Sequence, residues 1–369
     1  MIIVAFAVCL LILLGIAENC LHRRALQKIP LRILVNGTRG KTTVVRMIAS
    51  TLSVAGMKTY AKTTGSQARR ILPDASEIDY RKKRPANIME QLPFVRLAAK
   101  GGAEAIVVEC MALRPENQCL MADQLVRPQY VVMTNVYVDH VEEIGATREE
   151  TVQVLADSIP EGATVIGHDE SFRPYAGRLI VPTEDPDMEA FAGCAFLVHE
   201  ENVRLVLAPS DALGIARETA VRGIRQTKPD IGMYAGFRVG SCRIHNAFAA
   251  NDPVSFLAAL NDCAQQGPYR LLFNNRSDRG YRLKAFARAI ADCAAQPLEI
   301  GVIGEEKRWA ARYMGRVTGL PTGAVADAPA YVRALGARDG ESRLLCAGNI
   351  KGEGSKLLEV LIKDAQTYV

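Results

Sequence analysis

A glycine-rich heptapeptide near the N-terminus carries the residue types best suited to binding phosphate. An apolar run, residues 31–35, precedes it, and a helix-compatible segment, residues 44–55, follows it. In order, the heptapeptide reads Gly37, Thr38, Arg39, Gly40, Lys41, Thr42 and Thr43. Glycines let backbone N–H groups converge, and the dipole of a following helix favours an anion. The pattern predicts a phosphate-binding loop, with a plain glycine turn as the alternative.

Two residues of this loop have specific expected partners. Lys41 is placed to reach the β- and γ-phosphates of a nucleotide, and the Thr42 hydroxyl is placed to ligate Mg²⁺. The usual loop has a longer spacer between its two glycines, whereas two residues separate Gly37 from Gly40 here. We therefore expect a shortened variant of the nucleotide loop.

Further polar residues follow two other apolar runs. Glu109 comes directly after residues 105–108, and a polar segment, residues 134–140, follows residues 130–133. Apolar strands that alternate with helices predict a parallel sheet covered on both faces, and ligands bind beyond the carboxyl ends of such strands. The loop, Glu109 and the segment ending in His140 are therefore expected to converge. A surface carboxylate and an ordinary loop histidine are the alternatives.

The same alternation returns later in the chain. Beyond Gly267 and Pro268, strands are expected at residues 269–273, 298–303 and 343–346. This pattern predicts an α/β domain over residues 25–267, followed by a smaller Rossmann-like α/β domain over residues 268–369. Residues 160–240 read as the edge of the first sheet and its insertions, and residues 246–253 as the opening of a helix.

The first 17 residues are uncharged and almost wholly aliphatic, which is the short end of a membrane span. His22, Arg23, Arg24 and Lys28 follow, and positive charge on this flank favours a cytoplasmic location for the remainder. A cleaved signal peptide carries its positive charge ahead of the apolar run instead. We expect a single-pass membrane anchor over residues 1–24, with a buried helix of the fold as the alternative.

Composition excludes some classes of protein and leaves others open. The formal net charge of +5 is too small to indicate a nucleic-acid partner. Nine cysteines occur without a Cys-x-x-Cys pair, which argues against a zinc ribbon or a redox motif. Residues 58–84 are locally basic. The simpler interpretation is a solvated loop, and the more specific hypothesis is a surface that binds an anionic substrate or lipid headgroup.

Taken in order, these motifs resemble those of one enzyme superfamily. The loop is similar to the ATP loop of Mur ligases and folylpolyglutamate synthases, and residues 109–112, 134–140 and 245–250 resemble their later motifs. A closer resemblance, to the PgsB/CapB family of poly-γ-glutamate synthase ligase subunits, rests on six features. These are the N-terminal apolar span, Arg39 inside the loop, and residues 62–65, 109–111, 248–252 and 275–279.

The resemblance implies a fold and a reaction. The first domain would be a P-loop-type parallel-sheet ATPase domain like the central domain of Mur ligases. The family phosphorylates a carboxylate with ATP, and an amine then attacks the acyl phosphate to form an amide. Implied partners are glutamate, the poly-γ-glutamate chain, and small integral membrane subunits of a synthesis and export complex. A homo-oligomer is an open alternative.

The resemblance also assigns roles to individual residues. Thr42 and Glu109 would hold the Mg²⁺ that bridges the β- and γ-phosphates, and Mn²⁺ can substitute. His140 would ligate a second ion, so that two cations offset charge repulsion during attack. Asn135 would orient phosphate or metal-bound water. Asn246 would contact the adenine, unless it only caps a helix.

Other implied contacts come from the second domain and from the basic segment. Asp278 would contact the nucleotide, and Arg276 or Arg279 would stabilise charge after closure. Substrate contacts would come from Lys62, Thr63, Thr64, Arg69 and Arg70. In this hypothesis the basic residues guide the growing polyanion, while residues 81–84 lie further out.

One departure from the superfamily bears on the substrate. Cell-wall Mur ligases commonly carry a carbamylated lysine, but no lysine occurs here between Lys100 and Lys228. A carboxylate or water would then replace the carbamate, and the missing nucleotide-sugar domain favours an amino-acid polymer as product. Two rivals remain open: a related ligase such as a folate polyglutamylating enzyme, and a non-catalytic ATP-gated module of a membrane complex.

Overall fold

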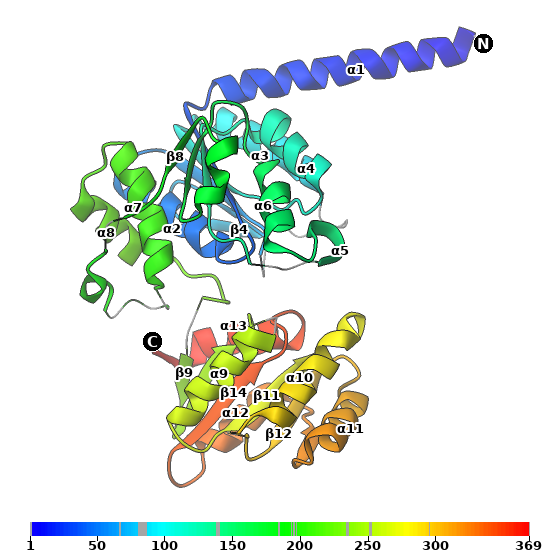
Figure 1. Cartoon of the computed structure of the whole chain (residues 1–369), viewed down its shortest axis with the longest axis vertical. Helices are drawn as coiled ribbons and strands as arrows, with labels where there is room; N and C mark the ends of the chain where they lie inside the picture. Colours follow the sequence, from blue (N-terminus) through cyan, green and yellow to red (C-terminus); the bar gives the residue numbers. More distant parts are fainter. Residues whose placement is uncertain are drawn as a thin grey trace. The chain divides into compact units, whose positions relative to one another are not determined.

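Two α/β units make up the chain (Figure 1). A computed structural model describes residues 2–65, 68–79, 87–137, 141–183, 185–192, 194, 196, 198–233, 236–250, 253–294 and 296–368. The first unit comprises residues 1–192 and 198–228, and the second comprises residues 193–197 and 229–369. Both are built on a largely parallel sheet flanked by helices, which confirms the predicted fold class.

An eight-stranded sheet forms the first unit, in the order β4-β3-β2-β5-β1-β6-β7-β8. Strands β2, β5, β1, β6, β7 and β8 run parallel, while the short β3 and β4 pair antiparallel at one edge. The central strands are buried along almost their whole length, as apolar runs of this kind require. The strands are β1 (Leu31–Asn36), β2 (Thr59–Thr63), β3 (Arg69–Ile71), β4 (Glu77–Asp79), β5 (Ala105–Glu109), β6 (Tyr130–Met133), β7 (Thr164–Gly167) and β8 (Arg178–Ile180).

Helices cover both faces of this sheet (Figure 1). One group, α2, α7 and α8, packs together, and the Ser50 hydroxyl of α2 donates to the Gly223 carbonyl of α8 at 2.7 Å. The α-helices are α1 (Ile2–Gln27), α2 (Lys41–Val54), α3 (Gln91–Lys100), α4 (Pro115–Leu120), α5 (Val141–Ile144), α6 (Arg148–Ala156), α7 (Glu200–Ala212) and α8 (Arg217–Arg225). Shorter 3₁₀ turns are η1 (Ile88–Glu90), η3 (Glu170–Tyr175) and η4 (Met188–Phe191), and η2 (Met121–Val126) is a π-helix.

Helix α1 has an exposed apolar part and a buried end. Within the part of the chain that the structure describes, it alone is long and apolar enough to cross a membrane, with a mean hydropathy of 2.5 in its most apolar window. Its last turns join the first unit, because Leu26 packs in one core cluster with Phe94 and Val126. His22 Nε2 lies 3.0 Å from the Leu125 carbonyl oxygen. The apolar helix is therefore joined directly to the sheet domain.

The second unit contains a seven-stranded sheet in the order β13-β12-β11-β14-β10-β9-β15. Strands β10 to β14 are parallel, and β9 and β15 add an antiparallel edge. The strands are β9 (Gly236–Val239), β10 (Cys242–Ala247), β11 (Arg270–Asn275), β12 (Ile300–Gly304), β13 (Thr322–Ala324), β14 (Ser342–Ala347) and β15 (Gln366–Tyr368). The helices are α9 (Pro253–Gln265), η5 (Ser277–Arg279), α10 (Gly280–Asp292), α11 (Lys307–Thr318), α12 (Ala328–Gly336) and α13 (Glu353–Asp364).

The predicted domain boundary at residue 267 is wrong, since the long segment of the second unit begins at Pro229. Strand β10 pairs with β14 in parallel, so the preceding β9 and the following α9 belong to the same unit. Gly267 and Pro268 form only the turn between α9 and β11. Asn246 accordingly lies in a strand and does not open a helix. The alternation of buried Cys242 and Ile244 with half-buried neighbours is the period-two signal of that strand.

Candidate nucleotide and metal site

The predicted loop lies between strand β1 and helix α2, at the carboxyl edge of the first sheet. Gly40 caps α2 with φ 79°, and Gly37 has φ 122°, both in the region that favours glycine. A Cβ on Gly37 would lie 2.2 Å from Thr134 Oγ1 and 2.9 Å from the Asn135 nitrogen. The strand, loop and helix order is confirmed, and the loop conformation depends on its glycines.

Lys41 folds back over its own loop. Its ammonium donates hydrogen bonds to the carbonyl oxygens of Gly37 and Thr38, the second at 3.2 Å. These contacts hold a positive charge at the loop, where the first backbone N–H groups of α2 also lie free of intrahelical partners. The loop is therefore arranged to bind an anion.

Asn135, which follows β6, holds the phosphate loop through hydrogen bonds. Its Oδ1 accepts hydrogen bonds from Thr38 Oγ1 at 2.6 Å and from the Arg39 nitrogen at 2.9 Å. Its Nδ2 donates to the Arg39 carbonyl at 3.1 Å. The side chain thus holds the backbone of the loop; the role toward phosphate or metal-bound water that the resemblance implies stays a prediction.

Glu109, at the end of β5, contacts one residue at the start of α2 and one just after β2. Its carboxylate is 3% exposed, and Oε2 accepts from Thr42 Oγ1 at 3.1 Å and from the Thr64 nitrogen at 2.7 Å. Both contacts use Oε2, which leaves Oε1 available as a ligand. The convergence of the loop and Glu109 that the sequence predicts is confirmed.

The pair fits a magnesium ion better than a zinc ion. No group of three His, Cys, Asp or Glu side chains suited to a metal occurs among the described residues. Mg²⁺, however, is commonly held by one or two protein oxygens together with water and substrate phosphates. The Thr42 hydroxyl and the Glu109 carboxylate supply such oxygens. His140, the predicted ligand of a second ion, lies outside the described residues.

Neighbouring polar atoms support a site at this edge. Thr134 Oγ1 and Thr63 Oγ1 are buried, each without a hydrogen-bond partner in the described part of the chain. Thr134 follows β6 and lies beside Gly37, and Thr63 ends β2 just before Thr64, whose nitrogen donates to Glu109. Cys110 follows Glu109, but burial raises the pKa of its thiol to about 11, so this cysteine is not a nucleophile at neutral pH.

A buried network behind the loop has no counterpart in the predicted site. Asn36 Oδ1 accepts from the Gly37 nitrogen at 2.8 Å, while its Nδ2 donates to Gln118 Oε1 at 2.7 Å and to Ser158 Oγ at 2.8 Å. All three side chains are 2% exposed or less. Asn36 adjoins the glycine motif, but no sequence pattern connects it with Gln118 or Ser158.

The prediction that Lys62 belongs to an exposed basic surface is wrong. Its side chain is fully buried, and Nζ lies 3.3 Å from Oε2 of Glu90, the last residue of η1. Arg69 lies on the β3–β4 hairpin, 3.9 Å from Glu77 and 4.0 Å from Asp79. Arg70 is half-buried on the same strand, and residues 81–84 lie outside the described residues.

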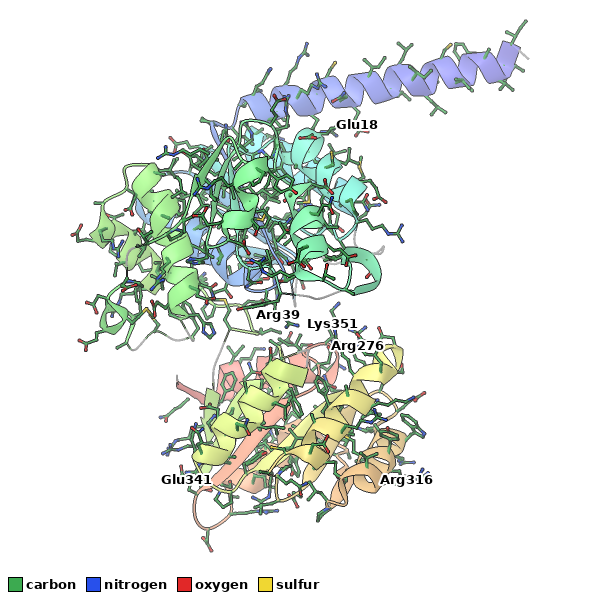
Figure 2. The ribbon with its side chains drawn as sticks, in the orientation of Figure 1. Glu18, Arg39, Arg276, Arg316, Glu341 and Lys351 are labelled. Atoms are coloured by element: carbon green, nitrogen blue, oxygen red, sulfur yellow. The ribbon has the colours of Figure 1, made fainter. Side chains whose placement is uncertain are left out.

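In the second unit, the predicted residues lie at the carboxyl edge of the parallel strands. Figure 2 shows Arg276 and Lys351 at the same edge. Arg276 forms an ion pair with Asp278, two residues later, while the side chain of Arg279 lies outside the described set. Asn246 Oδ1 accepts from the Phe248 nitrogen at 3.3 Å and holds the turn after β10.

Family comparisons match both units. Residues 35–175 match the Mur ligase middle domain, and residues 234–364 match the poly-gamma-glutamate synthase CapB C-terminal domain. The chain is 33% identical over 307 residues to the capsule biosynthesis protein CapB of Bacillus anthracis, covering 78% of this chain and 66% of that protein. It is 32% identical over 325 residues to the PGA synthase CapB of Bacillus subtilis strain 168, covering 83% and 82%.

Solved structures share the fold at low sequence identity. FolC of E. coli in complex with ADP superposes with a TM-score of 0.70 at 16% identity, covering 94% of this chain and 93% of that one. The bifunctional folylpolyglutamate synthase/dihydrofolate synthase of Yersinia pestis, complexed with AMPPNP and a Mn ion, gives 0.68 at 14% identity, covering 94% and 92%. The resemblance that the motifs indicate is thereby confirmed. The chain belongs to the CapB family of the Mur ligase superfamily, a group of ATP-dependent amide ligases.

Proposed function

We propose that this chain extends poly-γ-glutamate at the cytoplasmic face of a membrane, using ATP and Mg²⁺. The observation that carries the proposal is the meeting of the glycine loop, the Thr42 hydroxyl and the Glu109 carboxylate at one sheet edge in a CapB-family chain. A loop that binds phosphates beside a hard oxygen site is suited to phosphoryl transfer.

The proposed reaction has two steps. The γ-carboxylate of the acceptor attacks the γ-phosphorus of ATP, which forms an acyl phosphate and releases ADP. The amine of the incoming glutamate then attacks the acyl carbon, so that an amide forms while phosphate and a proton leave. A free carboxylate is a poor acyl donor, and phosphate is the better leaving group that makes the second step accessible.

Residues of the first unit would lower the charge barrier to the first step. Lys41 and the N–H groups at the start of α2 would contact the nucleotide phosphates once the ammonium leaves the loop carbonyls. Thr42 and Glu109 would hold Mg²⁺, which neutralises phosphate charge when bound. Asn36 and Asn135 hold the loop through the Gly37 and Arg39 nitrogens, respectively. His140, Arg276 and Arg279 keep the roles that the family resemblance implies.

Product analysis tests the substrate. The full chain, in membranes that contain its partner subunits, is incubated with ATP, Mg²⁺ and isotopically labelled glutamate, and the product is analysed by mass spectrometry. Oligomers that grow by one glutamyl residue and hydrolyse at γ-amide bonds are expected. Extension of a folate-type acceptor without glutamate polymer would favour the folate ligase alternative, and nucleotide binding without any amide product would favour the non-catalytic module.

Gly65→Ala tests the oxygen pair. A Cβ at this position would lie 2.3 Å from Thr42 Oγ1 and 3.4 Å from Thr42 Cβ, so rotation of the threonine hydroxyl away from Glu109 is the available response. We expect the Mg²⁺ concentration for half-maximal activity to rise by about tenfold, the lower end for lost support of a metal ligand. Gly323→Ala is the matched control, since nothing lies within 4 Å of a Cβ there. An unchanged Mg²⁺ titration in Gly65→Ala would separate Thr42 from the metal.

Deleting residues 2–17 tests the membrane anchor. The deleted part of α1 is exposed and apolar, while the packed turns around Leu26 remain. The truncated chain should leave the membrane fraction and lose polymer synthesis in whole membranes, but it should bind ATP with unchanged Kd. Sedimentation at high salt and a nucleotide titration measure the two outcomes. If the truncated chain still sediments with membranes, the anchor lies elsewhere.

A further inference from the structure

A pocket lies at the edge of the first sheet opposite the phosphate loop. Its volume is about 760 Å³, and it lies where α1 ends and strand β1 begins. Parallel strands carry the chain from this edge to the loop, and β1 has six residues, about 20 Å in length. The pocket is therefore separate from the nucleotide site. The side chains that matter are Arg23, Arg32, Asp123, Arg127, Asp157 and Glu161.

Arg32 is a preorganised cation in this pocket. Its Nε donates to the Arg127 carbonyl at 2.8 Å, and Nη1 donates to the carbonyls of Ile29 at 2.7 Å and Leu26 at 3.3 Å. These bonds fix the guanidinium plane against the junction between α1 and β1. These hydrogen bonds use Nε and Nη1, so the Nη2 amino group remains available to bind a ligand.

Arg127 projects from a strained position beside it. The residue has φ 49°, in the left-handed region, and it ends the π-helix η2. Left-handed non-glycine residues cost conformational energy, and both they and π-helical turns are concentrated at functional sites. The arginine side chain is exposed there. This placement brings a second guanidinium to the pocket at an energetic cost that a glycine would avoid.

The charges of the pocket balance. Three arginines (Arg23, Arg32 and Arg127) and three carboxylates (Asp123, Asp157 and Glu161) line it, and their formal charges sum to zero. One carboxylate is already engaged, because the Cys119 thiol donates to Asp123 Oδ2 at 3.2 Å. A pocket with both signs of charge matches a ligand that carries both, since a simple anion would leave the carboxylates unpaired.

The position along α1 indicates where that ligand comes from. Arg23 lies six residues beyond Ala17, where the apolar run ends, a rise of about 9 Å along a helix. Lipid headgroups occupy roughly the first 5–7 Å outside the hydrocarbon core. With α1 upright in a membrane, the Arg23 backbone would lie about 2–4 Å beyond this layer, so the pocket would adjoin the outer surface of the headgroups.

We propose that this pocket binds the headgroup of a zwitterionic phospholipid with a primary amine, such as phosphatidylethanolamine. The phosphate would lie against Arg23, Arg32 and Arg127, and the ammonium would donate to the carboxylates. A phosphatidylcholine headgroup has no N–H to donate, and a phosphatidylglycerol headgroup brings no cation. The proposal rests on the membrane anchoring of α1 proposed above, and it assigns the pocket to lipid recognition and not to catalysis.

Native mass spectrometry of the full chain tests the proposal. The chain is reconstituted in nanodiscs of equimolar phosphatidylethanolamine, phosphatidylcholine and phosphatidylglycerol, and the lipids retained after release are counted. Loss of a charge-assisted hydrogen bond corresponds to about tenfold in affinity, so phosphatidylethanolamine should exceed each of the other two by about tenfold. Equal retention of all three lipids, or a preference for phosphatidylglycerol, overturns the proposal.

Two variants and one matched control locate the effect. Arg127→Gly keeps the left-handed backbone and should raise Tm, while Arg23→Gln keeps the helix; the double variant should lose the phosphatidylethanolamine preference. Arg24→Gln, an exposed neighbour outside the pocket, should keep it. Flotation of the same proteins with pure phosphatidylcholine vesicles reports anchoring alone. Wild-type flotation without lipid preference rejects the pocket, whereas failure to float rejects the anchor and the pocket with it.

Discussion

Replacing Lys41 by alanine should lower kcat/KM for ATP-dependent ligation by about 10²–10³-fold, the range seen when one preorganised donor to developing charge is removed. The ammonium now donates to two loop carbonyls, which places it at the loop before any nucleotide arrives. Alanine preserves the helix start, because it is the best helix former. We therefore expect far-UV circular dichroism and Tm to change little while product formation collapses.

Lys58→Ala is the matched control for this prediction. That lysine is exposed, follows the end of α2, and lies at the amino edge of β2, away from the loop. It removes the same charge from the same unit and should leave kcat/KM within about twofold, as for ordinary surface substitutions. Near-normal ligation by Lys41→Ala would contradict the phosphate-loop interpretation, whatever the control does.

The parts of the fold that sequence predicts are those whose signals are local. An apolar run, two glycines and a helix start lie within residues 31–55, so the strand, loop and helix could be predicted from neighbours alone. Strand β6 formed at the expected residues 130–133 for the same reason. Convergence of Glu109 with the loop also followed, because parallel strands must end at one edge.

The parts that sequence missed depend on long-range packing. Lys62 reads as a surface cation within a basic segment, yet it is buried beside Glu90, which belongs to a separate turn. Asn36 meets Gln118 and Ser158 only after the sheet and its helices assemble. The predicted domain boundary is wrong for a similar reason, because a Gly-Pro turn has the same sequence signal within a domain as between two domains.

Glu109→Gln should raise the Mg²⁺ requirement of ligation by about 100-fold, the upper end for damage to a metal-binding group. Glutamine has nearly the same shape as glutamate, so the fold and the loop conformation should be preserved. In the structure one carboxylate oxygen accepts from both Thr42 Oγ1 and the Thr64 nitrogen. A glutamine amide has a single acceptor oxygen. If that oxygen keeps the two existing hydrogen bonds, the NH₂ group takes the place of Oε1 and turns donor hydrogens toward the cation.

The variant thus separates two roles that the carboxylate could have. If the Glu109 carboxylate is only a structural hydrogen-bond acceptor, glutamine can replace it. The Mg²⁺ activation curve of the variant is then the same as for the wild type. If the Glu109 carboxylate is a metal ligand, the glutamine variant shifts the activation curve to higher Mg²⁺ concentrations. Its nucleotide binding without metal, measured by titration in EDTA, is nearly unchanged. Glu104→Gln is the control, because Glu104 precedes β5 at the opposite edge of the same sheet, where its carboxylate accepts from the Lys58 nitrogen at 2.7 Å. Mn²⁺ should restore activity to Glu109→Gln less than to Gly65→Ala, because the second variant retains its charged ligand.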